Sequence, residues 1–220
     1  MPRTPVMERQ APGFYGKLAS HGDFIWRRLA PGFIGVWDGW LQACIQASRV
    51  QLGENWLDVY LTGPIWRFAL APGVCDGQAW AGVLMPSVDR VGRHFPLMIA
   101  AGADQAVPLA QWLGANWFEQ VEDLALSTLD VAFSFEQFDA ALLSLPGLPL
   151  SPAPGTNGPL GWQIGIESAN EAAGVADAVA CAALYGQSVW WTDGSERVEP
   201  CVRLCRGLPA PQAYGAMLKD

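Results

Sequence analysis

Charged residues are scarce in this sequence. Only 15% of the residues are charged, against roughly 25% in an average soluble domain, and 51% are hydrophobic. A chain of this composition buries a large core or has large apolar contact surfaces, and it is not disordered. Basic residues are the scarcest, because 13 Lys and Arg stand against 21 Asp and Glu, for a net charge of −8. Nucleic acids and anionic lipids bind clustered basic residues, so the sequence disfavours both as partners.

The sequence also lacks the apolar segments of a membrane or secreted protein. No apolar run reaches the roughly 18 residues of a membrane-spanning helix, and the first ten residues contain no apolar region typical of a signal peptide. The five cysteines, at positions 44, 75, 181, 201 and 205, are an odd number and are widely scattered. This pattern is typical of reduced thiols in a cytosolic protein. We therefore expect a cytoplasmic protein with no direct membrane insertion.

Hydrophobic periodicity predicts an α/β protein. Apolar residues recur with a helical period over 32–51, after Pro31, and Gly53 is expected to end this helix. Short apolar segments bounded by turn residues predict strands. The expected strands cover 13–18, 64–70, 79–85, 96–101, 162–166, 188–192 and 200–205. Further helices are expected at 109–129, 135–145, 169–185 and 212–218.

Because strands and helices alternate imperfectly, we predict a single domain over residues 1–220. It would contain a mixed β-sheet with helices on both faces, a three-layer α/β/α sandwich. Residues 1–12 are expected to be an extended lead-in, and residues 146–161 a loop rich in proline and glycine.

The segment 82–97 is expected to organise the fold. It contains a strand, a polar loop with Ser87, Asp89, Arg90, Arg93 and His94, and a second strand. Charged side chains at strand ends are typical of a functional site. The alternative is that Asp89 pairs with Arg90 or Arg93 and only fixes the loop. The two arginines are also suited to holding a carboxylate or a phosphate.

A second polar turn, with Lys17, Ser20, His21 and Asp23, follows the first expected strand. If the two loops meet, Ser, His and Asp side chains would be close enough for a nucleophilic triad. No Gly-x-Ser-x-Gly motif is present, however, and the adjacent Ser20 and His21 would point apart on an extended chain. His21, Asp23 and His94 have side-chain atoms that bind metals, but the two histidines lack a firm third ligand beside them. We therefore expect no catalytic residues, no metal and no cofactor.

The pair Trp190-Trp191 is the most unusual of the eleven tryptophans. Successive side chains on a strand point to opposite faces of the sheet. Two interpretations follow: the sheet is buried on both faces, or one ring is an aromatic anchor for a partner protein.

Several of these stretches together resemble the TagF family of type VI secretion-associated proteins, also called ImpM or SciT. The matching segments are GFYGKL at 13–18, SHGDF at 20–24, WDGWL at 37–41, PIWRF at 64–68, GVLMPSVDRVGRHFP at 82–96 and SVWWT at 188–192. Ala19 stands where the family usually has proline.

The resemblance implies a three-layer α/β/α fold and a cytoplasmic accessory protein that represses type VI secretion after translation. The implied partner is a forkhead-associated scaffold protein, and no catalytic residues are implied. Candidate binding residues are then Lys17, Ser20, His21, Asp23, Ser87, Asp89, Arg90, Arg93, Trp190 and Trp191. The alternative is a hydrolase or a binder of small anions that uses the loops 17–23 and 87–94. Polar groups around an open pocket would favour the alternative, whereas mutual pairing beneath the surface would favour a binding scaffold.

Overall fold

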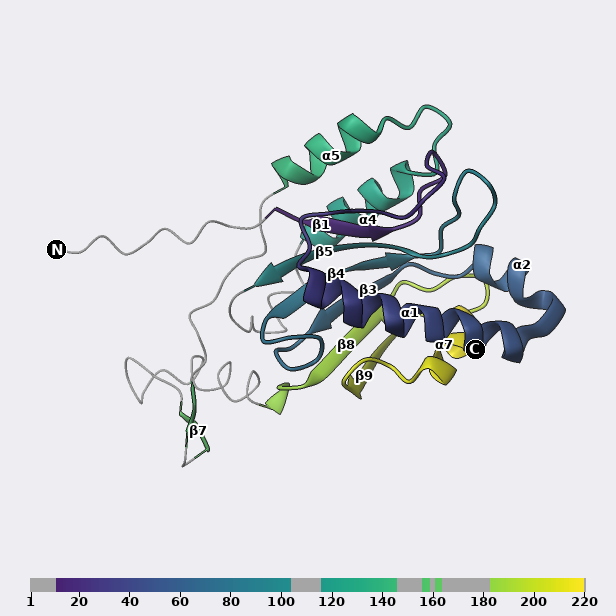
Figure 1. Cartoon of the computed structure of the whole chain (residues 1–220). Helices are drawn as coiled ribbons and strands as arrows, with labels where there is room; N and C mark the ends of the chain where they lie inside the picture. Colours follow the sequence, from purple (N-terminus) through teal and green to yellow (C-terminus); the bar gives the residue numbers. More distant parts are fainter. Residues whose placement is uncertain (1–10, 104–115, 146–155, 159–160, 164–182, 220) are drawn as a thin grey trace.

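The chain is built around one seven-stranded sheet (Figure 1), seen in a computed structural model that describes residues 11–103, 116–145, 156–158, 161–163 and 183–219. The order across the sheet is β2-β1-β5-β4-β3-β8-β9, and each pairing is antiparallel. The strands are β1 (Gly13–Gly16), β2 (Ile25–Arg27), β3 (Trp66–Leu70), β4 (Ala79–Met85), β5 (Leu97–Ala103), β8 (Gln187–Thr192) and β9 (Cys201–Arg206).

Helices cover both faces of this sheet, as expected for an α/β sandwich. One face carries α1 (Pro31–Leu52), α2 (Trp56–Leu61) and α7 (Tyr214–Leu218), and the other carries α4 (Trp117–Ser127) and α5 (Phe135–Ser144). Short 3-10 turns, η1 (Gly53–Asn55) and η2 (Pro211–Ala213), precede α2 and α7. The predicted sandwich is confirmed. The sheet is antiparallel, where a mixed sheet was expected, because its strands are joined by hairpins and by connections that reverse the chain.

The helix α1 shows why the sequence pattern was informative. Proline is well tolerated in its first turn, where the missing N–H has no helical partner. Its apolar stripe is buried against the sheet, and Gly53, with a φ of 54°, ends it by adopting a backbone conformation that other residues avoid. The buried residues of this stripe are Phe33, Trp37, Trp40, Leu41, Cys44, Ile45 and Ser48.

One hydrophobic core lies on each side of the sheet. The core under α1 is mainly aromatic, and Trp37 contacts Phe68 and Trp190 there with ring centroids 4.8 and 6.0 Å apart. On the opposite face, Phe118 of α4 packs edge-on against Trp191, with centroids 4.8 Å apart. Both faces of the central strands are therefore shielded from water.

Some predicted elements lie partly outside the described residues: the first part of the helix at 109–129, most of the helix at 169–185, and Cys181. Within the stretch 146–161, expected to be loop, β6 (Thr156–Gly158) pairs with β7 (Gly161–Gln163), which overlaps the start of the strand expected at 162–166. The antiparallel ladder of these two strands satisfies backbone groups that a pure loop would leave to water. Cys44, Cys75, Cys201 and Cys205 are free thiols. Among the described residues, no helix combines the length and the hydropathy needed to cross a bilayer.

Candidate functional site

The ends of strands β1, β4 and β5 meet at the candidate site. The strands β1 and β4 both pair with β5, so the loop after β1 and the loop between β4 and β5 lie at the same end of the sheet (Figure 1). Gly16, with a φ of 143°, permits this approach, because a Cβ there would lie 2.2 Å from the carbonyl oxygen of Pro96. The two loops singled out in the sequence are therefore brought together.

The Asp89 carboxylate is the centre of this junction. Its side chain is fully buried and forms an ion pair with the buried Lys17 and a second one with Arg93, whose Nε lies 2.6 Å from Asp89 Oδ2. The other carboxylate oxygen, Oδ1, accepts hydrogen bonds from the backbone N–H groups of Arg93, at 2.8 Å, and Val91, at 3.0 Å. The loop thus folds around a carboxylate whose bonds are all internal.

Ser87 is held in the same internal way. Its hydroxyl donates to the carbonyl oxygen of Lys17 at 2.7 Å, and its N–H donates to the hydroxyl oxygen of Tyr60 at 3.0 Å. The hydroxyl of Tyr60 in turn donates to the carbonyl oxygen of Ser87 at 2.9 Å. A serine whose proton is directed at a backbone carbonyl has no base to activate it. Its role here is to join β1, α2 and the loop.

The electrostatics of Asp89 follow from these contacts. Burial by itself would raise the pKa of the carboxyl, but the hydrogen bonds from Lys17, Arg93 and Val91 outweigh burial and hold the pKa well below its usual range. Asp89 is therefore ionised at neutral pH and acts as the fixed anion of the loop.

This shift predicts how stability depends on pH. The unfolded chain binds a proton at Asp89 near the ordinary pKa of 3.8, whereas the folded chain resists protonation until the pH is lower. The contribution of Asp89 to stability is therefore complete above that value and is lost as the pH falls below it. Urea denaturation at pH 6, 5, 4 and 3 should show the difference in unfolding free energy between the wild type and Asp89→Asn shrinking between pH 4 and pH 3. A difference that stays constant down to pH 3 would contradict the prediction.

Ser20 and His21 do contact each other, contrary to the expectation that their side chains point apart. Because they lie in a turn and not on an extended strand, Ser20 Oγ comes within 2.8 Å of His21 Nδ1. Among the described residues, however, no carboxylate hydrogen-bonds to the His21 imidazole. Its ring packs against Phe135 of α5, with centroids 4.9 Å apart. A serine–histidine pair without an orienting acid is not a complete triad.

The two histidines belong to different layers. His94 packs edge-on against Trp56 and Tyr60 of α2, with ring centroids 5.8 Å apart in each case, whereas His21 contacts α5 on the opposite face. Burial, reinforced by the charge of Arg49, lowers the pKa of His94 and favours its neutral form. The ligand set His21, Asp23 and His94 is not assembled, and no group of three or more potential metal ligands occurs within the part of the chain that the structure describes.

The tip of the 86–96 loop is exposed, as are Ser20 and Asp23 of the neighbouring turn. The N–H of Arg90 donates to the carbonyl oxygen of His21 at 2.9 Å, which fixes the tip against the turn, while its side chain is exposed. Among the described residues, the Arg90 guanidinium forms no ion pair with a carboxylate. Arg93, by contrast, is bound to Asp89, to the carbonyl oxygen of Gly22 and, at 3.4 Å, to Asp23. Arg90 is therefore the cation of this loop that remains available to a partner.

Two apolar residues beside this tip were missed in the sequence. Val91 is 65% exposed and Phe24 is 42% exposed, and the Lys17 Nζ lies 4.7 Å from the centre of the Phe24 ring. The sequence feature that could have indicated Val91 is its apolar side chain inside a polar loop, between Arg90 and Gly92. Together Arg90, Val91 and Phe24, here called the tip surface, combine charge with exposed apolar area.

Trp190 and Trp191 are core residues. Trp190 is 0% exposed beneath α1 and Trp191 is 7% exposed beneath α4. Burial of the sheet on both faces accounts for the pair, as the first interpretation predicts.

The comparisons with known proteins agree with this architecture. Residues 13–145 match the family described as the TagF N-terminal domain, type VI secretion system-associated. The crystal structure of PA0076 from Pseudomonas aeruginosa PAO1 is 41% identical, and the match covers 94% of each chain with a TM-score of 0.81. A comparison with curated proteins found no match. The matched residues include β1 to α5 and therefore both loops of the site. The chain belongs to the TagF family of type VI secretion system-associated proteins.

Proposed function

We propose that this protein is a non-enzymatic, cytoplasmic accessory protein that represses type VI secretion after translation by binding a forkhead-associated scaffold protein. Membership of the TagF family supports the association with type VI secretion. The single observation that carries the rest is the internal pairing of the polar residues at the site. The buried Lys17 pairs with the buried Asp89, and the hydroxyl of the buried Ser87 donates to the carbonyl oxygen of Lys17. These groups contact one another beneath the surface and do not converge on an open pocket.

Such a junction suits a binding protein because it fixes a loop before the partner arrives. Asp89 and Ser87 hold the main chain on both sides of the tip, so little conformational entropy is lost when Arg90 and Val91 are covered. Arginine and aromatic residues are enriched among the side chains that carry binding energy. We therefore place the scaffold-binding surface at the tip surface of Arg90, Val91 and Phe24.

The charge of the tip surface indicates which region of the partner it contacts. The chain has a net charge of −8, yet the tip surface carries the guanidinium of Arg90, and the exposed Arg93 beside it is paired with Asp89 and Asp23. A positive group on a negative protein restricts the orientation of an approaching partner. An acidic or carbonyl-rich patch of the scaffold protein fits this position.

The test is a binding measurement between the purified protein and the forkhead-associated protein from the same genome. Arg90→Glu is expected to weaken binding at least tenfold, about 1.4 kcal/mol, with an unchanged circular dichroism spectrum. The matched control is Arg206→Glu, which makes the same charge change on the exposed face of β9, at the other edge of the sheet.

Two results would overturn this proposal. Absence of binding at tens of micromolar would remove the scaffold as a direct partner. An equal loss in Arg90→Glu and Arg206→Glu would show that overall charge, and not the tip surface, determines binding.

A further inference from the structure

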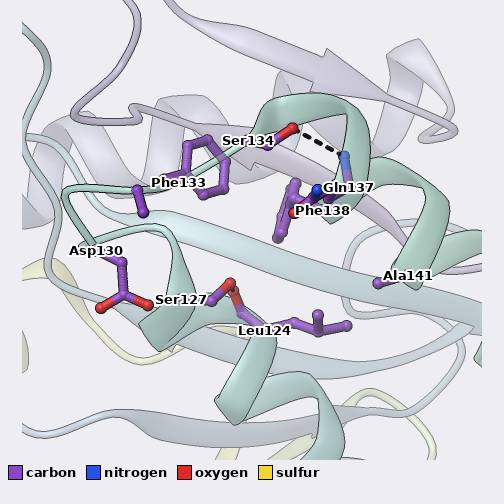
Figure 2. A pocket seen from close by; sticks show the side chains of 9 residues that line it. Leu124, Ser127, Asp130, Phe133, Ser134, Gln137, Phe138 and Ala141 are labelled. Carbon is purple, nitrogen blue, oxygen red and sulfur yellow. Dashed lines mark hydrogen bonds between the residues drawn. The ribbon is translucent and has the colours of Figure 1, made fainter.

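A second surface lies on the opposite layer, between α4 and α5. A pocket of about 260 Å³ opens there, lined by residues of both helices and of the turn that joins them. Figure 2 shows Leu124 of α4 on one side, Phe133 and Phe138 on the other, and Ala141 farther along α5. Five of the nine lining residues are apolar and the polar ones are Ser127, Asp130, Ser134 and Gln137, so the pocket suits an aliphatic or aromatic side chain with a polar neighbour.

The turn between the two helices exposes apolar side chains next to this pocket. Leu129 is 51% exposed and Val131 is completely exposed, and between them Asp130 lines the pocket. Exposed apolar residues that adjoin a pocket with a polar group at its edge are characteristic of protein-binding surfaces. The pocket thus continues into an apolar rim that carries one carboxylate.

The charged residues of the two helices and their connecting turn are all acidic. No Lys or Arg occurs between Arg93 and Arg197, whereas the described part at 116–145 contains six acidic residues. Two of these acids are neutralised by arginines of the sheet, because Glu122 pairs with Arg67 and Asp139 pairs with Arg27 and Arg28. The others are Glu119, Asp123, Asp130 and Glu136.

We infer that the α4–α5 pocket docks a basic amphipathic segment of a partner protein. An apolar side chain of that segment occupies the pocket, and a neighbouring lysine or arginine pairs with Asp130. Charge complementarity selects this occupant, because the pocket lies between helices whose own charged residues are all acidic, and these attract cationic segments and repel acidic ones. The segments 104–115, 146–155 and 164–182 of the chain itself contain no Lys or Arg and lack the charge for this role.

The experiment uses a fluorescent amphipathic peptide composed of leucine and lysine, and a second peptide with glutamate in place of every lysine. Fluorescence anisotropy with the full chain is expected to show binding of the lysine peptide and none of the glutamate peptide. Ala141→Phe, which fills the pocket, and Asp130→Lys, which reverses its charge, should each weaken binding at least tenfold. Asp123→Lys makes the same charge change at an exposed position of α4 outside the pocket lining and should retain binding.

Two kinds of outcome would overturn the proposed docking site. Equal binding of both peptides, or equal weakening by Asp123→Lys, would overturn the docking site in favour of unspecific attraction. Tighter binding after removal of residues 1–10, which contain Arg3 and Arg9, would assign the pocket to the chain's own N-terminal segment and overturn the assignment to a partner. Arg90→Glu should leave peptide binding unchanged, so failure here is distinguishable from failure of scaffold binding.

Discussion

Trp190→Ala is expected to lower the free energy of unfolding by about 4 kcal/mol, within the range for removal of a buried tryptophan. The ring is completely buried and contacts Trp40 and Phe68, with centroids 5.4 and 5.2 Å apart. Alanine would leave a cavity among rigid aromatic rings that cannot collapse onto it. It would also remove the indole N–H that donates to Ser188 Oγ at 2.9 Å. Since domains are typically stable by about 5–15 kcal/mol, this loss is a large fraction of the total.

Urea denaturation followed by far-ultraviolet circular dichroism measures this effect without relying on tryptophan fluorescence. The matched control is Trp26→Ala on the edge strand β2, where the side chain is 56% exposed. Its removal should cost less than about 1 kcal/mol. Similar losses in both variants would contradict the assignment of Trp190 to the core.

Asp89→Asn is expected to lower the temperature of thermal unfolding by roughly 10 °C, because loss of one partner leaves a buried charge uncompensated. The buried Lys17 would lose its carboxylate, and the 86–96 loop would lose the anion around which it folds. Asp23→Asn is the control, since that carboxylate is 96% exposed and meets Arg93 only at 3.4 Å. Its unfolding temperature should stay within about 2 °C of the wild type.

A double variant tests whether the ion pair of Lys17 and Asp89 has a structural role. Lys17→Met combined with Asp89→Leu replaces the ion pair by apolar side chains of similar size, a change that proteins often tolerate. We expect it to recover part of the stability lost in Asp89→Asn. If the single variant unfolded at the wild-type temperature, Asp89 would not hold the loop as described.

The sequence predicted the elements whose signals are local. The helical period after Pro31, the strands at 64–70 and 79–85 and the alternation around Trp190 each depend on neighbouring residues, and each is confirmed. The alternative that Asp89 pairs with a nearby arginine is also local, and the ion pair of Asp89 with Arg93 confirms it.

The contacts that define the site are not local and could not be predicted in this way. Lys17 and Asp89 are 72 positions apart and meet only because β1 pairs with β5. Nothing in the residues 187–192 indicates that β8 lies beside β3, which places Trp190 beneath α1. The contact of Ser20 with His21 depends on the conformation of a turn, which the pattern of residue types alone does not specify.

The separation between the frame of the 86–96 loop and its tip has an evolutionary consequence. The frame consists of buried side chains and main-chain hydrogen bonds, and Gly92, with a φ of 84°, completes the turn. None of these frame contacts uses the side chains at positions 90 and 91. A lineage can therefore exchange those two residues without altering the loop, and the protein can coevolve with a changing partner while its architecture stays constant.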